Sequence, residues 1–552
     1  MSPLARGTPR LLWQGVARSP QTPYGVTHVP EPNTPSQGGQ RLDTLRPLVR
    51  TRPDLTLLSA FALAIWLSAG TLLLRAQPPK MPLMRVVDLD AGEPAAEVVL
   101  HNGAKARIEL LGRSAVSDTV RGAVRHARVR LKVNGQEVEP ECGNYNLPVT
   151  VAGVQVDCAV TRDFLSNSRT DPWGLVKDAR LRLWPAGSPF MAPGTYTYPV
   201  KQRWFATTTQ MSNEASFVDG SETPWSRKIY YHYGLDTGGA EGMTEVIAAT
   251  GGLVVVRGKS AMPAYEKNPY TEVGYDGVIV LDERGWFHWY FHLYSIDPNL
   301  KLGAKIPMAQ PIGLIGKEGS AGCWSHLHYE IRGPQPSEKP GIVEGYVFLW
   351  EAYQRQYAPD VIAVARPHAY AWVGETVTLD GSRSSSRSGP ISRYEWTFTD
   401  GSAGTGPTFT RVYENPGTYS EILKVTDSRG HSSYDFAVVQ IAAKPVVERQ
   451  VEESLAPTIH ASYWPSLGTR AGQPITFLVR SCRTTFGQET WNFGDGSAPV
   501  TVKSDGCAEE KNKQGYARTQ HVFQKPGDYI VRVERANERG EKATFHLFVP
   551  VK

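Results

Sequence analysis

The sequence predicts a mainly β, multidomain protein that begins with one N-terminal transmembrane helix and continues through several β-rich domains. A chain of 552 residues is too long for a single hydrophobic core, and its length suggests three to five domains. Its 52 glycines and 41 prolines are typical of many short strands joined by turns. With 41% hydrophobic and 20% charged residues, most of the chain should fold.

The N-terminal region is predicted to be a disordered cytoplasmic segment followed by a membrane span. Residues 1–54 contain Pro, Gly, Ser, Thr and seven arginines without sustained periodicity. The uncharged run Leu55–Leu74 is just long enough to cross a hydrocarbon core of ~30 Å. Because arginines precede this run, we expect the N-terminus to stay in the cytoplasm. We interpret residues 55–75 as an uncleaved anchor; a cleaved signal segment that releases a secreted protein is the alternative.

Residues 85–200 are predicted to form a β-rich domain of unknown role, outside the cytoplasm in either case. The segment RVRLKVNG at 128–135 alternates apolar and charged residues and ends in Asn-Gly, which is typical of a β-hairpin. Nothing in this region indicates chemistry. A spacer and a lid over the neighbouring domain both remain open.

The five cysteines form two local pairs and one remaining residue. Cys142 and Cys158 lie close together in the sequence, as do Cys482 and Cys507, and Cys323 stands apart. The absence of a Cys-x-x-Cys motif argues against a zinc site built from cysteines. We predict the disulfides Cys142–Cys158 and Cys482–Cys507, formed in an oxidising compartment, with Cys323 left as a thiol. Five reduced, buried cysteines are the alternative.

An internal repeat follows residue 357. The segment YEWTFTDGS at 394–402 matches ETWNFGDGS at 489–497, and each is followed by Pro-Gly-x-Tyr and then an alternating strand. Trp and Phe two positions apart lie on one face of a strand, so both should point into a sandwich core, and Asp-Gly should reverse the chain. The second copy carries about 15 extra residues between its two motifs.

These repeated motifs resemble those of PKD domains, which are immunoglobulin-like β-sandwiches. The resemblance implies one PKD-like domain at 357–445 and another at 457–552. It implies spacers or binding modules, with a polysaccharide or a protein as the partner, and it implies no chemistry of their own.

Five of the thirteen histidines lie in three clusters between residues 232 and 328. The first is HYGLD at 232–236, where the glycine favours a turn over a helix. The second is HWYFHL at 288–293, at the end of a strand-like run. The third is HLHYEIR at 326–332, whose two histidines should project from one strand face ~7 Å apart. One of them can bind a metal ion while the other faces the group that the metal activates.

A hydrolytic zinc site requires these residue types. Zinc usually takes three nitrogen or oxygen ligands and keeps a fourth position for water. The ion lowers the pKa of that water toward ~7, so that hydroxide is available at neutral pH. A neutral histidine nearby can take the proton and return it to the leaving amine, and a second can stabilise the oxyanion.

In this order, the three clusters resemble the motifs of the lysostaphin/LytM-type zinc endopeptidases. The resemblance covers residues 228–335, within a peptidase domain expected at 201–356. It implies an antiparallel β scaffold of the duplicated hybrid motif type, with the site in a groove and peptidoglycan peptides as substrates. It also implies five site residues: His232, Asp236 and His328 as Zn2+ ligands, and His292 and His326 as the catalytic pair.

Two positions depart from the family pattern. His288 stands where the family commonly has Thr, on the strand face predicted for His292, and either tunes that imidazole or is a core histidine, which we favour. Cys323 replaces a small residue shortly before His326. A fourth protein ligand would close the water site, so we interpret Cys323 as a bystander.

The sequence therefore predicts an exported zinc metalloendopeptidase that cuts peptidoglycan peptides. The net charge of +5 is spread over the chain and does not indicate nucleic-acid binding. Two alternatives remain: a catalytically silent activator that binds peptidoglycan, and a scaffold of the cell envelope that acts through its PKD-like domains.

Overall fold

The computed structural model describes residues 81–216, 229–444 and 455–552. The predicted disordered segment 1–54 and the predicted membrane segment 55–75 lie outside these ranges. Within them, no helix has the length and apolar character needed to cross a bilayer. All described residues belong to one compact unit, Pro78–Lys552.

The N-terminal β-rich region consists of two four-stranded antiparallel sheets, ordered β1-β8-β7-β6 and β2-β3-β4-β5. The predicted hairpin is present: Asn134 and Gly135, with φ of 47° and 90°, join β4 to β5. The elements are β1 Arg85–Leu89, β2 Ala96–Val99, β3 Lys105–Ser117, β4 Val124–Val133, β5 Gln136–Val138, β6 Val149–Val151, β7 Val154–Thr161, the 3-10 helix Arg162–Leu165 and β8 Ala179–Pro185.

The predicted Cys142–Cys158 disulfide is not formed, and both residues are free thiols. They lie opposite each other in an isolated parallel bridge, so the prediction that they are neighbours in space holds. Each is 1% exposed. Burial raises the pKa of the Cys142 thiol, which keeps the reactive thiolate scarce. The predicted Cys482–Cys507 disulfide is present.

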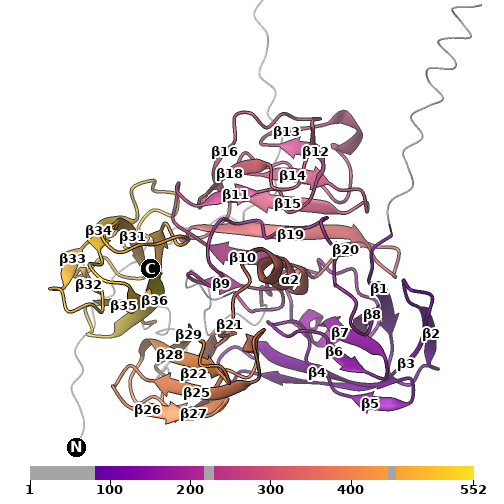
Figure 1. Ribbon diagram of the computed structural model, residues 1–552, viewed down its shortest axis with the longest axis horizontal. Coiled ribbons are helices and arrows are strands. Elements are labelled where there is room, and N and C mark those ends of the chain that lie inside the picture. Colours follow the sequence, from indigo (N-terminus) through magenta and orange to yellow (C-terminus); the bar gives the residue numbers. More distant parts are fainter. Residues whose placement is uncertain (1–80, 217–228, 445–454) are drawn as a thin grey trace, which may run out of the picture. The chain divides into compact units, whose positions relative to one another are not determined.

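A nine-stranded sheet forms the centre of the next region, with the path β13-β12-β14-β15-β19-β10-β9 and with β17 and β20 at its margins (Figure 1). A three-stranded sheet, β11-β18-β16, accompanies it. The strands are β9 Thr209–Gln210, β10 Leu235–Gly238, β11 Glu245–Ile247, β12 Gly252–Arg257, β13 Ser260–Ala261, β14 Val278–Leu281, β15 Phe287–Phe291, β16 Leu293–Ile296, β17 Lys305–Ile306, β18 Pro311–Ile315, β19 His326–Pro334 and β20 Pro340–Ile342, with a 3-10 helix at Pro263–Tyr265.

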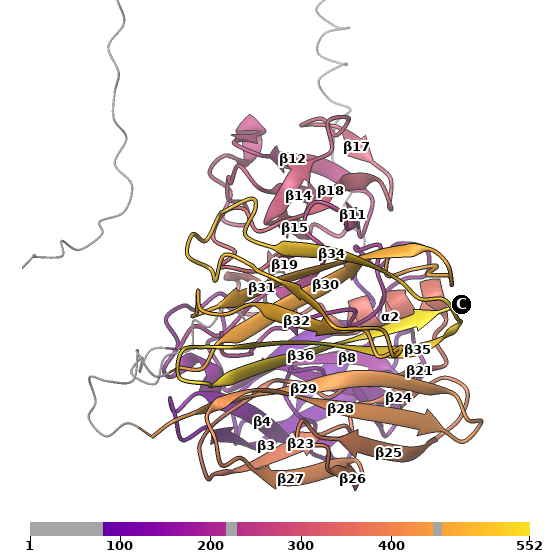
Figure 2. The same cartoon turned by 90° about the vertical axis from the view of Figure 1, so that its left-hand side faces the viewer.

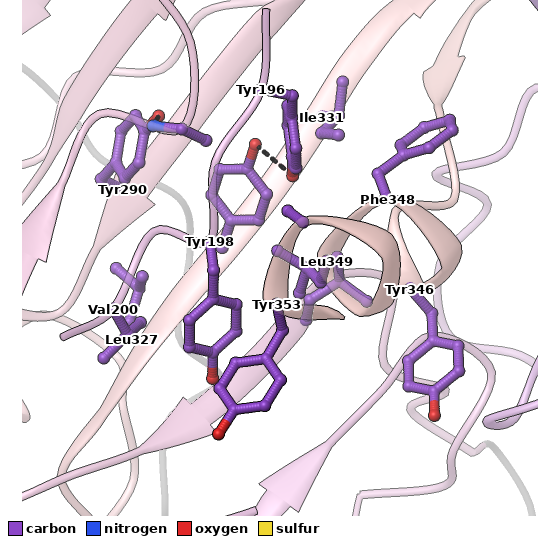
Figure 3. Close-up of a cluster of buried hydrophobic side chains, with 14 of the residues drawn as sticks. Tyr196, Tyr198, Val200, Tyr290, Leu327, Ile331, Tyr346, Phe348, Leu349 and Tyr353 are labelled. Carbon is purple, nitrogen blue, oxygen red and sulfur yellow. Dashed lines mark hydrogen bonds between the residues drawn. The ribbon is translucent and has the colours of Figure 1, made fainter. Parts of the chain in front are cut away.

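Helix α2, Tyr346–Tyr357, packs against one face of this sheet, and Figure 3 shows its aromatic side chains near Tyr196 and Tyr198 of the segment before β9. Leu327 and Ile331 of β19 point toward the helix side and join the same buried cluster. Because side chains alternate along a strand, His326 and His328 face the opposite side of the sheet. The helix side is thus filled by core residues, and the other face is left for the polar cluster.

The two C-terminal β-sandwiches share one sheet, with the path β22-β29-β28-β36-β35-β32-β33; β25 pairs with β28 and with β26 (Figure 2). The smaller sheets are β21-β24, β23-β27 and β30-β31-β34. The first sandwich contains β21 Val361–Ile362, β22 Ala369–Trp372, β23 Thr376–Asp380, β24 Ser385–Ser386, β25 Ile391–Thr397, β26 Ala403–Thr405, β27 Thr408–Val412, β28 Gly417–Asp427 and β29 Ser432–Ala442. The second contains β30 Thr458–Trp464, β31 Pro474–Cys482, β32 Glu489–Asn492, β33 Val500–Val502, β34 Ala517–Val522, β35 Gly527–Ala536 and β36 Lys542–Val551.

The repeated Trp-x-Phe motif fills each sandwich core, as predicted. Trp396 and Phe398 are buried in the first sandwich, and Trp491 and Phe493 are buried in the second. Each pair lies two residues apart, so both rings point inward from the same strand face.

Candidate active site

Strand pairing brings the predicted carboxylate ligand and two histidines onto one face of the large sheet. In the antiparallel pair β10–β19, Asp236 lies opposite His328 and Gly238 lies opposite His326. Residues directly opposite in such a pair share a face, so the Asp236 and His328 side chains meet. His328 Nδ1 is 2.8 Å from Asp236 Oδ1, and His326 Nε2 is 3.3 Å from Asp236 Oδ2.

His232 reaches the same point from the segment before β10, which is a turn and not a helix, as predicted. Its backbone N–H donates to Glu214 O over 2.7 Å and ties this segment to the chain that follows β9. Gly234 permits the approach, because a Cβ there would lie 2.4 Å from Cε1 of His328. Any side chain at position 234 would displace the imidazole.

Three lone-pair donors therefore converge in a geometry that fits a zinc ion. His232 Nε2 is 3.1 Å from His328 Nδ1 and 3.1 Å from Asp236 Oδ2. Ligand atoms at 2.0–2.1 Å from a tetrahedral zinc lie about 3.3 Å apart, close to these separations. Since His232, Asp236 and His328 form a group of potential metal ligands, we take them as the residues that would hold the ion.

Glu330 holds the His328 ring in the orientation that a metal requires. Its Oε1 accepts a hydrogen bond from His328 Nε2 at 2.6 Å, so Nδ1 is the nitrogen directed at Asp236 and His232. Burial alone would lower the pKa of His328, but the carboxylates of Asp236 and Glu330 raise it to about 10. Burial raises the pKa of Asp236, yet His232, His326 and His328 together hold it well below its usual range. Metal binding at this group must therefore release a proton.

His292 enters the site because β15 ends one residue before it. Its backbone has φ 65°, in the left-handed region, which breaks the alternation of the strand. The backbone N–H donates to Asp276 Oδ2 at 3.0 Å. Nδ1 lies 2.8 Å from Glu318 O, and because a carbonyl only accepts, Nδ1 carries the proton and Nε2 is left as the acceptor.

His326 stands beside His292 with its imidazole held neutral. The two ring centroids are 4.8 Å apart, and the His328 ring lies 5.6 Å from that of His292. Burial keeps the pKa of His326 well below its usual range, with a smaller contribution from its two histidine neighbours and partial opposition from Asp236. Because the imidazole is neutral, one of its ring nitrogens keeps a free lone pair that can accept a proton.

His288 is a core histidine, and the prediction that it shares a strand face with His292 is wrong. Its Nε2 lies 3.0 Å from Asp282 Oδ2, and its Nδ1 lies 2.8 Å from Tyr329 Oη, on the side of the sheet that faces α2. The left-handed backbone at His292 turns that residue to the other face. The favoured interpretation of His288 as a satisfied core residue is therefore supported by its contacts.

Cys323 lies away from the His232–Asp236–His328 group in the described residues. Its Sγ is instead within 4.8 Å of the sulfur atoms of Cys482 and Cys507. Sequence reasoning also left two residues of the site without a role, Asp276 and Glu330. Glu330 stands inside the third histidine motif, where a carboxylate two residues from a histidine was the available signal, whereas Asp276 lies outside the three motifs.

Residues 230–340 match Peptidase family M23. Residues 358–441 and residues 460–549 each match a PKD domain. The chain contains an M23 peptidase domain followed by two PKD domains. The resemblance inferred from the histidine motifs and the repeated Trp-x-Phe segments is confirmed at this level, and the two sandwiches are referred to below as the first and second PKD domains.

Individual similar proteins cover the chain unevenly. Collagenase ColA of Bacillus cereus is 33% identical over 81 residues, which span 15% of this chain and only 8% of the collagenase. Lysostaphin from Staphylococcus simulans is 17% identical over 45% of this chain and 92% of its own, with a TM-score of 0.21. Csd3 of Helicobacter pylori is 14% identical over 50% of this chain and 82% of its own, with a TM-score of 0.20.

Proposed function

We propose that the M23 domain is a zinc metalloendopeptidase that hydrolyses peptide bonds in peptidoglycan cross-links. The observation that carries this proposal is the convergence of three potential zinc ligands with two further histidines on one sheet face. The M23 match supports the reaction class. When bound, zinc supplies a water of lowered pKa and polarises the attacked carbonyl.

The two histidines outside the ligand group would move protons and stabilise charge. His326 is neutral, and its Nδ1 lies 3.2 Å from Trp324 O, so Nδ1 is the donor and Nε2 is the acceptor on the Asp236 side. We assign it as the general base. His292, fixed through Nδ1 by Glu318 O, presents Nε2 to the substrate; once that nitrogen has taken up a proton, it would stabilise the oxyanion or give the proton to the leaving amine.

A catalytically silent activator is the alternative that the same fold would serve. Loss of a ligand would favour that function, but His232, Asp236 and His328 are all present and close together. Catalysis is therefore the better assignment.

We further propose that the chain is exported and held in the membrane by residues 55–74, with its bulk in the periplasm or outside the cell. Release as a secreted protein after signal cleavage is the alternative. The Cys482–Cys507 disulfide supports an oxidising compartment. The PKD domains would bind a polysaccharide or a protein of the envelope.

Digestion of purified sacculi tests the catalytic proposal. Zinc-loaded protein should release peptides whose masses identify the bond that is cut, and the Asp236→Ala variant should release none. Binding of zinc-loaded protein to sacculi without release of peptides would support the silent activator instead.

A further inference from the structure

The short loop that carries the chain into His326 is held by the second PKD domain. This loop, residues 323–325, donates the Ser325 backbone N–H to Tyr516 Oη at 2.7 Å. The carbonyl of Cys323 accepts a hydrogen bond from Arg480 Nη1 at 3.0 Å. Both partners belong to the second PKD domain, more than 150 residues further along the chain.

Trp324, between these two anchors, belongs to the core of the second PKD domain. It is 3% exposed and packs in the same cluster as Ile459 and Ala461 of β30. The ring of His460, also on β30, meets its indole edge to face at a centroid distance of 5.3 Å. The indole is therefore fixed by contacts from outside the M23 domain.

The same indole is stacked on the catalytic histidine. The ring centroids of Trp324 and His326 are 4.0 Å apart, and their planes differ by 18°. Trp324 also fixes the tautomer of His326, since its carbonyl accepts from His326 Nδ1. Trp324 thus contacts the imidazole through both its backbone and its ring, and it touches no ligand of the metal group in these contacts.

Arg480, which contacts the 323–325 loop, is held in place by the extra residues of the second PKD repeat. Arg480 forms two hydrogen bonds to Asp505, at 2.9 and 2.8 Å, and donates to the carbonyls of Glu509 and Glu510. A Cβ at Gly515 would lie 2.7 Å from Arg480 Nε, so glycine is required for this close approach. The Cys482–Cys507 disulfide closes the base of the same insertion.

Tyr516 completes this support at the C-terminal end of the insertion. Its hydroxyl lies 2.5 Å from His460 Nδ1 while accepting the Ser325 N–H. One hydroxyl therefore joins the loop to β30, and the residue is buried. The first PKD domain has no such insertion between its two motifs.

We propose that the second PKD domain positions His326, with Trp324, Tyr516 and Arg480 as positioning residues that act through the 323–325 loop. This inference rests on the proposed function, because it takes His326 to be catalytic. The physical reason is that general-base catalysis depends on the placement of the acceptor nitrogen. A shift of about 1 Å caused by a change remote from the chemistry can cost about 10²-fold in rate.

The test compares turnover in variants of the full-length, zinc-loaded protein. Trp324→Leu keeps an apolar side chain but removes the stacked ring, and it should lower kcat by about 10- to 100-fold, with KM and zinc content little changed. Trp324→Phe restores a ring and should recover most of this loss. Tyr516→Phe, which retains its ring, should lower kcat several-fold.

The matched control is Tyr529→Phe. Its hydroxyl donates to Lys525 O at 2.8 Å inside the second PKD domain, so the change removes a tyrosine hydrogen bond without touching the 323–325 loop. Its kcat should equal that of wild type. Equal losses in Tyr529→Phe and Tyr516→Phe would mean that general destabilisation is being measured, and would overturn the inference.

NMR chemical shifts can report the position of the Trp324 ring relative to His326 in the absence of substrate. An indole stacked at 4.0 Å shields the imidazole, so the carbon-bound protons of His326 should be shifted upfield in NMR spectra of histidine-labelled protein. This shift should disappear in Trp324→Leu and reappear in part in Trp324→Phe. Unchanged His326 resonances in Trp324→Leu would overturn the inference whatever the activity.

The kinetics of His326→Ala separate this inference from the proposed function. Full activity in His326→Ala would remove the catalytic assignment, and the inference with it. If His326→Ala is inactive while Trp324→Leu and Tyr516→Phe both keep wild-type kcat, the catalytic assignment stands and the positioning role alone is refuted.

Discussion

The two PKD domains have the same sandwich core but make different contacts with the peptidase domain. Each places a buried arginine, paired with an aspartate, at that contact. In the first domain, Arg366 bonds to Asp435 and donates to Thr209 Oγ1 at 2.6 Å. In the second, Arg480 bonds to Asp505 and donates to Cys323 O.

The difference lies in what each contacted segment carries. Thr209 belongs to β9, which pairs with β10, the strand that carries Asp236. Cys323 lies three residues before His326, and Trp324 between them stacks on its ring. On the roles proposed above, one copy of the repeated fold supports a strand beside the site, and the other contacts the loop that carries the proposed catalytic histidine.

The largest expected effect is the loss of zinc, which should abolish turnover. The smaller changes in kcat expected from variants of the PKD domains can be compared with this complete loss. Asp236→Ala and His328→Ala should each lose zinc and all turnover, because two remaining ligands hold the ion poorly. Elemental analysis of purified protein checks this. Full zinc occupancy in both variants would refute the ligand assignment, and Glu241→Gln, at a buried carboxylate outside the ligand group, is the control.

The catalytic pair should lose turnover while keeping zinc. His292→Ala and His326→Ala should each fall by about 10²–10⁴-fold, which is the usual contribution of general acid–base catalysis. The two losses should be non-additive, because groups that act in one transition state fail together. The release of wall peptides is the measurement. Survival of activity in both variants would contradict the catalytic assignment.

The paired arginines test the difference between the PKD domains directly. Arg480→Met and Arg366→Met each leave an aspartate unpaired, and each should destabilise the protein by up to about 3–5 kcal/mol, less where Asp505 is reached by water. Only Arg480→Met should also lower kcat, since only it removes a bond to the 323–325 loop. Denaturant unfolding and steady-state kinetics on the same preparations measure the two effects. Equal falls in kcat in Arg480→Met and Arg366→Met would show that the two PKD domains do not differ in their effect on the site.

The cysteines give a smaller difference between the two PKD domains. Reduction of Cys482–Cys507 should cost the second PKD domain about 3 kcal/mol, as expected for a short closed loop, and leave the first unchanged. Mass mapping of non-reduced peptides should find that bridge, with Cys142 and Cys158 alkylated once the protein is unfolded. We still expect Cys323 as a thiol, and a bridge containing it would contradict this.

Much of the site could be predicted from the sequence because its residues lie in local motifs. Asp236, His326 and His328 meet through one strand pair, and strand periodicity is enough to place them on one face. His232 joins them from the turn before β10, four residues from Asp236 in the same motif. Strand periodicity does not predict the position of His292, because its backbone is in the left-handed region, where its N–H donates to Asp276.

The parts that the sequence could not predict depend on contacts between distant segments. Tyr516 and Trp324 lie almost 200 residues apart in the chain, and neither is part of a motif that links the two domains. The Cys142–Cys158 prediction failed for a different reason. Proximity was correctly inferred, but whether two buried thiols are oxidised is a chemical state that spacing alone cannot give.

The smallest expected effect is a pH dependence that arises from buried histidines of the PKD domains, and it can be compared between His368 of the first domain and His460 of the second. Burial, with a smaller contribution from Arg366 and Arg125, lowers the pKa of His368 to about 3. Burial, with a smaller contribution from Arg480, lowers the pKa of His460 to about 3. In the unfolded chain, a histidine binds a proton as the pH falls below about 6.5. In the folded protein, these two buried histidines stay neutral until the pH approaches 3. Stability is therefore full above pH 6.5 and falls as the pH drops toward 3, by about 1.4 kcal/mol per pH unit for each histidine.

His460→Gln and His368→Gln should each remove one proton from this dependence, which denaturant unfolding between pH 7 and pH 5 can measure. The two variants should differ in catalysis at pH 7. His460 contacts both Trp324 and Tyr516, so its replacement should lower kcat several-fold, whereas His368 belongs to the first PKD domain and its replacement should not. An unchanged pH slope in both variants would show that these imidazoles titrate in the folded state. Equal kcat values would show that the contact of His460 with the 323–325 loop has no bearing on His326.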